Sequence, residues 1–116
     1  MSLEPGSLIL LHLISPSEKF WGVLERLEPV GVTFRGISLE VFEEWVTEIV
    51  RAEPASLGLS TMFVPLFRIE RMFLDETIGA VESYRQRCER RTGRTISDVL
   101  GRGGWLGPEP TPGRPS

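Results

Sequence analysis

The sequence has very little of the side-chain chemistry on which most enzymes and metalloproteins depend. Its 116 residues include one cysteine, Cys88, and one histidine, His12. A single cysteine excludes an intrachain disulfide, and this usage is typical of a reducing compartment. A metal ion would need further ligands beside these two residues, and a Ser–His or Cys–His nucleophile would depend on His12 alone. We therefore expect no metal, no cofactor and no catalytic activity.

Long apolar runs are also missing from the chain. No segment approaches the roughly 20 apolar residues that cross a bilayer. The apolar run "SLILLHLI" at residues 7–14 follows Glu4 and has no Lys or Arg before it, whereas a secretory signal begins with a basic region. The sequence therefore predicts a cytoplasmic protein with no membrane association.

The chain also lacks an excess of positive charge. The formal net charge is −3, while nucleic-acid-binding proteins usually carry a basic excess. The charges are nevertheless unevenly distributed: residues 40–53 contain five Glu against Arg51, and residues 82–94 contain five Arg against two Glu. These segments are either two solvated helix faces or oppositely charged surfaces that meet, within a subunit or between subunits.

The first third of the chain has the pattern of β-strands. The segments 7–14, 20–27 and 30–37 are short and apolar, and the last of them alternates residue by residue. The second and third segments are joined only by Glu28-Pro29, so we expect an antiparallel hairpin. Gly22 lies inside the second segment, where a glycine marks a bulge, a sharp bend or a close backbone approach.

The pattern then changes to that of a helix. Five apolar residues recur at i, i+3, i+4, i+7 and i+8, which predicts an amphipathic helix over residues 39–52. Ser38 is placed to cap its start, and Pro54 is placed to stop it. The apolar stripe must cover either the protomer's own sheet or a neighbouring subunit. Its residues are Phe42, Trp45, Val46, Ile49 and Val50.

Strand character returns in "STMFVPLFRIERMFLDE" at residues 60–76. Pro65 cannot donate a ladder hydrogen bond, so we predict two strands, over about residues 61–64 and 67–74, joined at a tight corner. A helical extension is expected over residues 77–101. A Gly/Pro-rich tail, expected to be disordered, follows over residues 102–116.

Two of these segments resemble the motifs of a known family. Gly22, the acidic Glu28 six positions later and the alternating arm "VGVTFRG" at residues 30–36 resemble the first motif of the Sm/LSm family, which includes the bacterial Sm-like RNA chaperone. The hydrophobic pattern of residues 62–74 is similar to the second motif. The resemblance covers residues 7–76. It implies a five-stranded, strongly bent Sm-like or SH3-like barrel whose edge strands pair between subunits to close a ring.

The resemblance also shows where this chain departs from the family. Val32 and the run Phe67-Arg68-Ile69 stand where the family places its RNA-contacting residues, and the RNA-binding signature residues are not retained. The helix at residues 39–52 lies between strands three and four, where the family usually has a short loop. The predicted fold class is therefore mainly β with α, as an Sm-like barrel over residues 1–76 with an inserted helix.

The function that we expect is a non-catalytic binding or scaffolding module that self-associates through its sheet edges. Gly22 and Pro65 have structural roles in this hypothesis. The expected contact surface combines the helix face with the last two strands. Its residues are Phe42, Trp45, Ile49, Phe63, Val64, Arg68, Ile69 and Arg71.

Two alternatives remain open at this stage. Arg87, Arg90, Arg91 and Arg94 follow the spacing i, i+3, i+4 and i+7, so they share one helix face. That face could bind phosphates of a nucleic acid, bind an acidic partner, or simply be solvated. The second alternative is a small barrel that acts as a monomeric protein-interaction domain.

Overall fold

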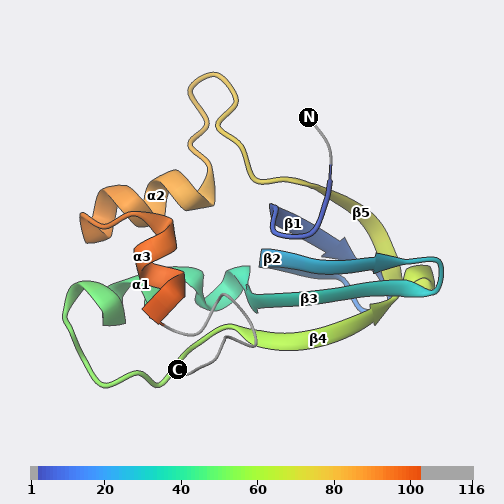
Figure 1. Ribbon diagram of the computed structural model, residues 1–116, viewed down its shortest axis with the longest axis horizontal. Helices are drawn as coiled ribbons and strands as arrows, with labels where there is room; N and C mark the ends of the chain where they lie inside the picture. Colours follow the sequence, from blue (N-terminus) through green and yellow to red (C-terminus); the bar gives the residue numbers. More distant parts are fainter. Residues whose placement is uncertain (1–2, 103–116) are drawn as a thin grey trace.

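The structure, a computed structural model, describes residues 3–102 and combines one antiparallel sheet with helices gathered at one of its ends (Figure 1). The mainly β fold with added α-helices is as predicted. The strands are β1 (Leu8–Leu13), β2 (Glu18–Glu28), β3 (Gly31–Ser38), β4 (Ser60–Pro65) and β5 (Ile69–Leu74). The helices are α1 (Phe42–Val50), α2 (Tyr84–Thr92) and α3 (Ile96–Arg102), with 3-10 turns η1 (Leu39–Val41) and η2 (Leu66–Arg68).

The five strands form an open sheet in the order β4-β3-β2-β1-β5. The sheet does not close into the predicted five-stranded barrel, because β4 and β5 lie at opposite edges and are not paired with each other. They meet only through η2, whose three residues cross one end of the sheet. The Leu66 N–H donates to the Val30 carbonyl at 2.9 Å, and the Ile14 N–H donates to the Arg68 carbonyl at 2.8 Å. From that end the two edges run apart toward the helices (Figure 1).

The predicted local elements are present with shifted bounds. The helix expected over residues 39–52 is η1 followed by α1, and the Ser38 hydroxyl accepts the Glu40 N–H at its start. The two strands expected around Pro65 are β4 and β5, with residues 66–68 in η2 between them. The helical extension divides into α2 and α3. Apart from Arg102, the last residue of α3, the predicted disordered tail at residues 102–116 lies outside the described residues.

Gly22 lies at a close backbone approach between β2 and β3. It is directly opposite Gly36. A Cβ atom on Gly22 would lie 2.1 Å from the Arg35 carbonyl oxygen and 2.4 Å from the Gly36 Cα. A Cβ on Gly36 would meet the ring of Phe34 at 2.3 Å. The glycine pair therefore lets the hairpin strands approach each other and leaves room for a core aromatic ring.

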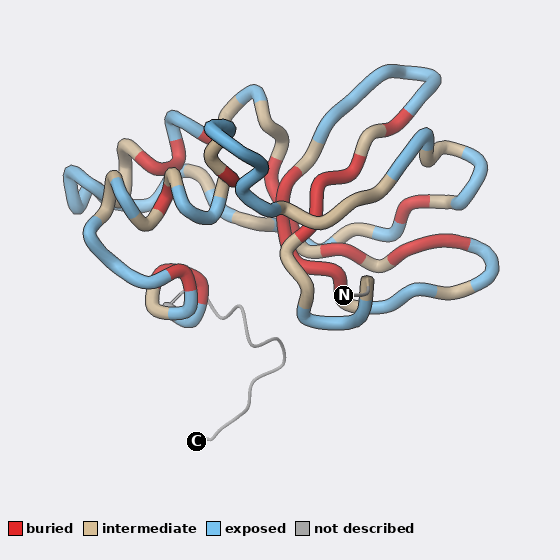
Figure 2. The backbone as a smooth tube through the Cα atoms, turned by 90° about the horizontal axis from the view of Figure 1, so that it is seen from above, coloured by how far each residue is buried: buried red, intermediate tan, exposed pale blue. Residues whose placement is uncertain are grey.

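The sheet separates two apolar clusters. On one face, strand residues including Trp21 and Ile37 pack with α1, α2 and α3. On the other face, Leu11, Leu24 and Phe34 pack with further strand side chains and with Leu3, which precedes β1. Since no helix of residues 3–102 contributes to this second cluster, the sheet itself must curl around it. Buried residues lie along the middle of the strands, and the turns between the strands are exposed (Figure 2).

Candidate interaction surfaces

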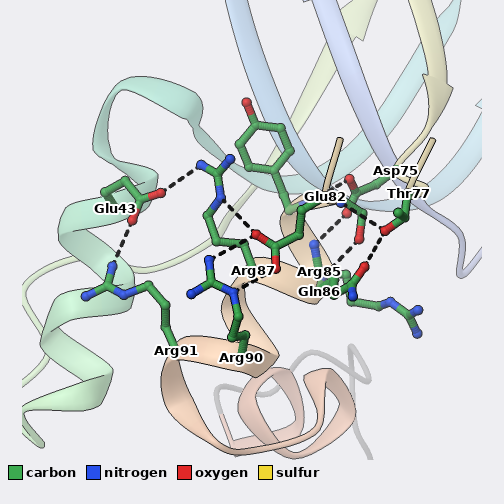
Figure 3. Close-up of polar contacts among 11 residues, drawn as sticks. Glu43, Asp75, Thr77, Glu82, Arg85, Gln86, Arg87, Arg90 and Arg91 are labelled. Atoms are coloured by element: carbon green, nitrogen blue, oxygen red, sulfur yellow. Dashed lines mark hydrogen bonds and ion pairs between the residues drawn. The ribbon is translucent and has the colours of Figure 1, made fainter. Parts of the chain in front are cut away.

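The arginine face of α2 meets the acidic face of α1 within one chain. Arg87 Nη1 lies 2.8 Å from Glu43 Oε2, and Arg91 Nη1 lies 2.7 Å from Glu43 Oε1 (Figure 3). Arg91 also donates to the Thr47 hydroxyl at 3.2 Å. The two oxygens of Glu43 thus each accept one arginine. The sequence left open whether the acidic and basic segments are solvated, meet within a subunit or meet between subunits. The structure shows that they meet within the subunit.

A second carboxylate, Glu82, holds another arginine of this face. Arg90 donates through Nε and Nη2 to the two Glu82 oxygens at 2.8 and 3.0 Å, in a bidentate pair. This hydrogen bond lowers the pKa of Glu82 and raises the pKa of Arg90. Three of the four predicted arginines therefore already bind carboxylates, and within residues 3–102 Arg94 has no ion pair. A phosphate would have to displace these carboxylates to bind here.

Asp75 ties the start of α2 to the sheet, and the sequence analysis missed it. Its carboxylate accepts the Trp21 Nε1–H at 2.9 Å. It also accepts the backbone N–H groups of Tyr84 and Arg85, both at 2.8 Å (Figure 3). Ser83 supplies the ordinary cap by accepting the Gln86 N–H. Asp75 lies just after β5 and nine residues before the helix that it caps, so no local spacing rule identifies it.

The loop between β5 and α2 is a short hairpin that projects from the molecule (Figure 1). Ile78 and Val81 exchange backbone hydrogen bonds at 3.0 and 2.9 Å, and Gly79 has a φ of 59° at the turn. Thr77 bonds Gln86 and accepts the Ser83 N–H, which ties the hairpin to α2. Ile78 and Val81 are 67% and 71% exposed.

The helix face that we expected at a subunit contact lies in the core instead. Phe42 and Trp45 are 1% and 6% exposed, and both pack on Trp21, with ring centroids 5.3 and 5.7 Å from its ring. Ile49 is half-buried against the same cluster. Phe42 also contacts the Tyr84 ring at 5.1 Å. The stripe covers the protomer's own sheet, so these residues are not available to a second subunit.

The remaining predicted contact residues divide between core, turn and surface. Val64 is buried, and Ile69 is half-buried against the same cluster. Arg68 fixes the end of the sheet, because it donates to the Ile14 and Pro16 carbonyls and to Glu18 at 2.7, 2.9 and 3.1 Å. That leaves two exposed members of the predicted surface, Phe63 on β4 and Arg71 on β5.

Both edge strands, β4 and β5, are open on their outer sides within residues 3–102, and the β4 edge is the uncharged one. β4 pairs with β3 on one side, and within residues 3–102 no strand pairs with its other side. Its sequence, "STMFVP", has no charged residue. Exposed apolar side chains continue from this strand around the same end of the sheet. We call this group the apolar end, and it consists of Leu27, Val30, Phe63, Leu66 and Phe67.

The two reactive side chains noted in the sequence lie apart. The His12 ring packs edge-on against Phe73 at 5.0 Å, and burial, followed by the charges of Lys19 and Arg71, lowers its pKa. Burial raises the pKa of the Cys88 thiol to about 11, so this thiol is protonated and unreactive at neutral pH. Within residues 3–102, no group of three or more His, Cys, Asp or Glu side chains is placed to hold a metal ion.

None of the helices in residues 3–102 is both long enough and apolar enough to cross a membrane. No family model matches the chain, and no curated protein or solved structure matches it either.

Proposed function

We propose that this chain is a non-catalytic, Sm-like binding module that self-associates through the edge of its sheet. The observation that carries the proposal is the β4 edge, which is uncharged, has no paired strand on its outer side within residues 3–102, and continues into the apolar end. An unpaired strand presents a row of N–H and C=O groups that seek another strand. Natural proteins usually protect such an edge with charge or a covering segment, and β4 has no charge of its own.

The Sm-like part of the proposal is supported by the path of the chain. Two edge strands that are linked by only three residues must converge at that end of the sheet. The second apolar cluster draws side chains from β1, β2, β3 and β4, with half-buried residues of β5 beside it. Both features favour a curled sheet whose interior is filled by its own side chains. An edge left open in such a sheet is free to take a strand from a second molecule.

The apolar end adds burial to the backbone pairing. Phe67 and Val30 are 81% and 68% exposed, and Leu66 is joined to Val30 by a backbone hydrogen bond. Phe63 lies over Gly31, because a Cβ on that glycine would be 2.6 Å from the Phe63 ring. Full burial of each such side chain is worth roughly 1.5–3 kcal/mol. Exposed apolar side chains at one end of a sheet are typical of interaction sites, which supports the proposal.

Light scattering on the purified protein tests the proposal. We expect the mass to rise from one chain of 13.0 kDa toward a multiple of it as the concentration reaches tens of micromolar. Phe63→Lys places a charge on the open edge and should keep the protein monomeric. Glu70→Lys, at an exposed position of β5, is the matched control and should associate like the wild type. A protein that stays monomeric at every concentration would contradict the proposal.

The nucleic-acid alternative has weaker support, because Glu43 and Glu82 already neutralise three arginines of the α2 face. Filter binding with a short RNA distinguishes the two hypotheses. We expect little retention even at low salt. Strong retention that the double variant Arg90→Glu/Arg91→Glu abolishes would favour the alternative.

A further inference from the structure

We infer that two copies of this chain form a two-fold dimer in which β4 pairs antiparallel with β4, centred on Met62. This inference rests on the proposed self-association and specifies its partner, a second copy, and its register. It joins two five-stranded sheets into one continuous sheet.

The hydrogen bonds of β4 establish which residues face the open edge. Leu66 lies opposite Val30 in the register that pairs Pro65 with Gly31, and its N–H donates to the Val30 carbonyl. Residues of an antiparallel strand alternate between bonding to one neighbour and to the other. Val64 and Met62 therefore bond toward β3, as Leu66 does. Thr61 and Phe63 direct their N–H and C=O groups away from the sheet, toward the open edge.

One register uses all of these outward groups. If Met62 lies opposite Met62 of the second copy, Thr61 of each chain lies opposite Phe63 of the other. Every outward donor and acceptor of Thr61 and Phe63 then has a partner. Centring the pair on Phe63 instead places Thr61 opposite Pro65, which has no N–H to donate. Pro65 therefore both ends the intermolecular ladder and selects its register.

The charges on the two edges favour pairing of like edges through β4. A two-fold contact brings the same strand of each copy together, so charged residues on that strand would be brought together across the contact. β4 has no charge, whereas β5 exposes Glu70 and Arg71. Charges on an edge strand oppose pairing with another strand. Pairing of β4 with β4 avoids these charges, and pairing of β4 with β5 would bring them into the contact.

The outer face of β4 also offers a place for the aromatic ring of the second copy. Thr61 and Phe63 point to the same face of the strand, opposite to Val64 and the cluster beneath it. Arg35, directly across from Thr61 on β3, donates to the Thr61 hydroxyl at 3.4 Å. In the proposed register, Phe63 of the second copy lies beside Thr61 and within reach of the Arg35 guanidinium. A cation above that ring would add to the contact.

Disulfide trapping with Met62→Cys tests the register. Residues of a non-hydrogen-bonded antiparallel pair have Cα atoms about 4.5 Å apart, which a disulfide can span. We expect mild oxidation to convert most of the variant to a covalent dimer. Cys88 is buried and should stay reduced. Arg71→Cys, exposed on the other edge, is the control and should cross-link no more than random collision allows.

A second pair of variants keeps the test independent of the folding of Met62→Cys. A mixture of Thr61→Cys and Phe63→Cys should cross-link, because their Cα atoms oppose each other at about 5.5 Å. Either variant alone should not, because its two copies lie diagonally, about 7–8 Å apart. Circular dichroism checks that each variant is folded. Association without either cross-link would overturn the β4 dimer and leave self-association intact, whereas a strict monomer would overturn both proposals.

Discussion

The arginine face of α2 and the β4 edge are both surface features, but they differ in what their polar groups bind. On α2, the guanidinium groups of Arg87, Arg90 and Arg91 bond to carboxylates of the same chain. On β4, the outward backbone groups have no partner strand within residues 3–102. The charged surface, which is conspicuous in the sequence, is satisfied internally. Of the two edge strands, β4 carries no charge, and we propose that it binds a second molecule.

Charge density is therefore a poor guide to the surface that we propose for binding, the β4 edge. A carboxylate on α1 or in the loop before α2 neutralises each of the paired arginines at little structural cost. An edge strand cannot be satisfied in this way, because its N–H and C=O groups need another strand.

The largest effect is expected from a methyl group added where the sheet is tightest. Gly22→Ala would place a Cβ 2.1 Å from the Arg35 carbonyl oxygen, and a backbone atom cannot move aside as a side chain can. We expect the free energy of unfolding to fall by about 3 kcal/mol. Urea denaturation followed by tryptophan fluorescence measures it. Gly58→Ala, where a Cβ meets nothing within 4 Å, is the control and should change stability by less than about 0.5 kcal/mol.

Removing the anchor of α2 should have the next largest effect. Asp75→Ala leaves the buried Trp21 Nε1–H and two backbone N–H groups without their acceptor. We expect a loss of about 2 kcal/mol and faster reaction of Cys88 with a thiol reagent, because α2 opens more often. Glu76→Ala, at the exposed neighbouring position, should leave both unchanged. Unaltered Cys88 reactivity in Asp75→Ala would show that this carboxylate does not hold the helix.

A smaller effect is expected from the ion pairs between α1 and α2. Glu43→Gln removes the carboxylate that Arg87 and Arg91 share, and all three side chains are partly solvated. Arg87 keeps its longer pair with Glu82 at 3.9 Å. The loss should be below about 1 kcal/mol and should shrink as salt is added, since exposed pairs are screened. Glu44→Gln changes the next residue and is the matched control. A large loss that salt does not alter would show that these pairs behave as buried ones.

The smallest effect is a change in the pH dependence of stability. The Arg90 hydrogen bond lowers the pKa of Glu82 in the folded protein below its ordinary value of 4.5. The stabilisation is therefore fully present above that value and is lost as the pH falls through the lowered pKa. Denaturation of the wild type and Glu82→Gln across acid pH should show a shallower decline for the variant. Parallel curves would remove Glu82 from the acid-sensitive groups.

The sequence was sufficient for the local elements. Alternation over residues 30–37 and a single helical stripe over residues 39–52 identified β3 and α1, because each pattern follows from the geometry of one element. Because Pro65 has no N–H to donate, we predicted a break in the strand there, and the structure confirms it between β4 and β5. The opposite charges of residues 40–53 and 82–94 also indicated a possible contact between these segments, and Glu43 makes that contact with α2.

Features that depend on contacts between elements could not be predicted from the sequence patterns. An apolar stripe shows that Phe42 and Trp45 are covered, but not whether the cover is the same chain or another. Strand patterns do not show whether two edges pair, so the open sheet was not foreseen. Asp75 reaches the N–H groups of a helix nine residues away, and only the path of the loop between them makes that contact possible.

The most direct test of the account is the mass of the protein by light scattering at tens of micromolar, in low and in high salt. We predict twice the 13.0 kDa chain mass in both, because the β4 contact involves backbone hydrogen bonds and apolar side chains. Phe63→Lys should give the mass of one chain, and Arg87→Glu/Arg91→Glu should remain dimeric. A single-chain mass for the wild type, or a dimer that salt and the arginine variant abolish while Phe63→Lys does not, would contradict the account.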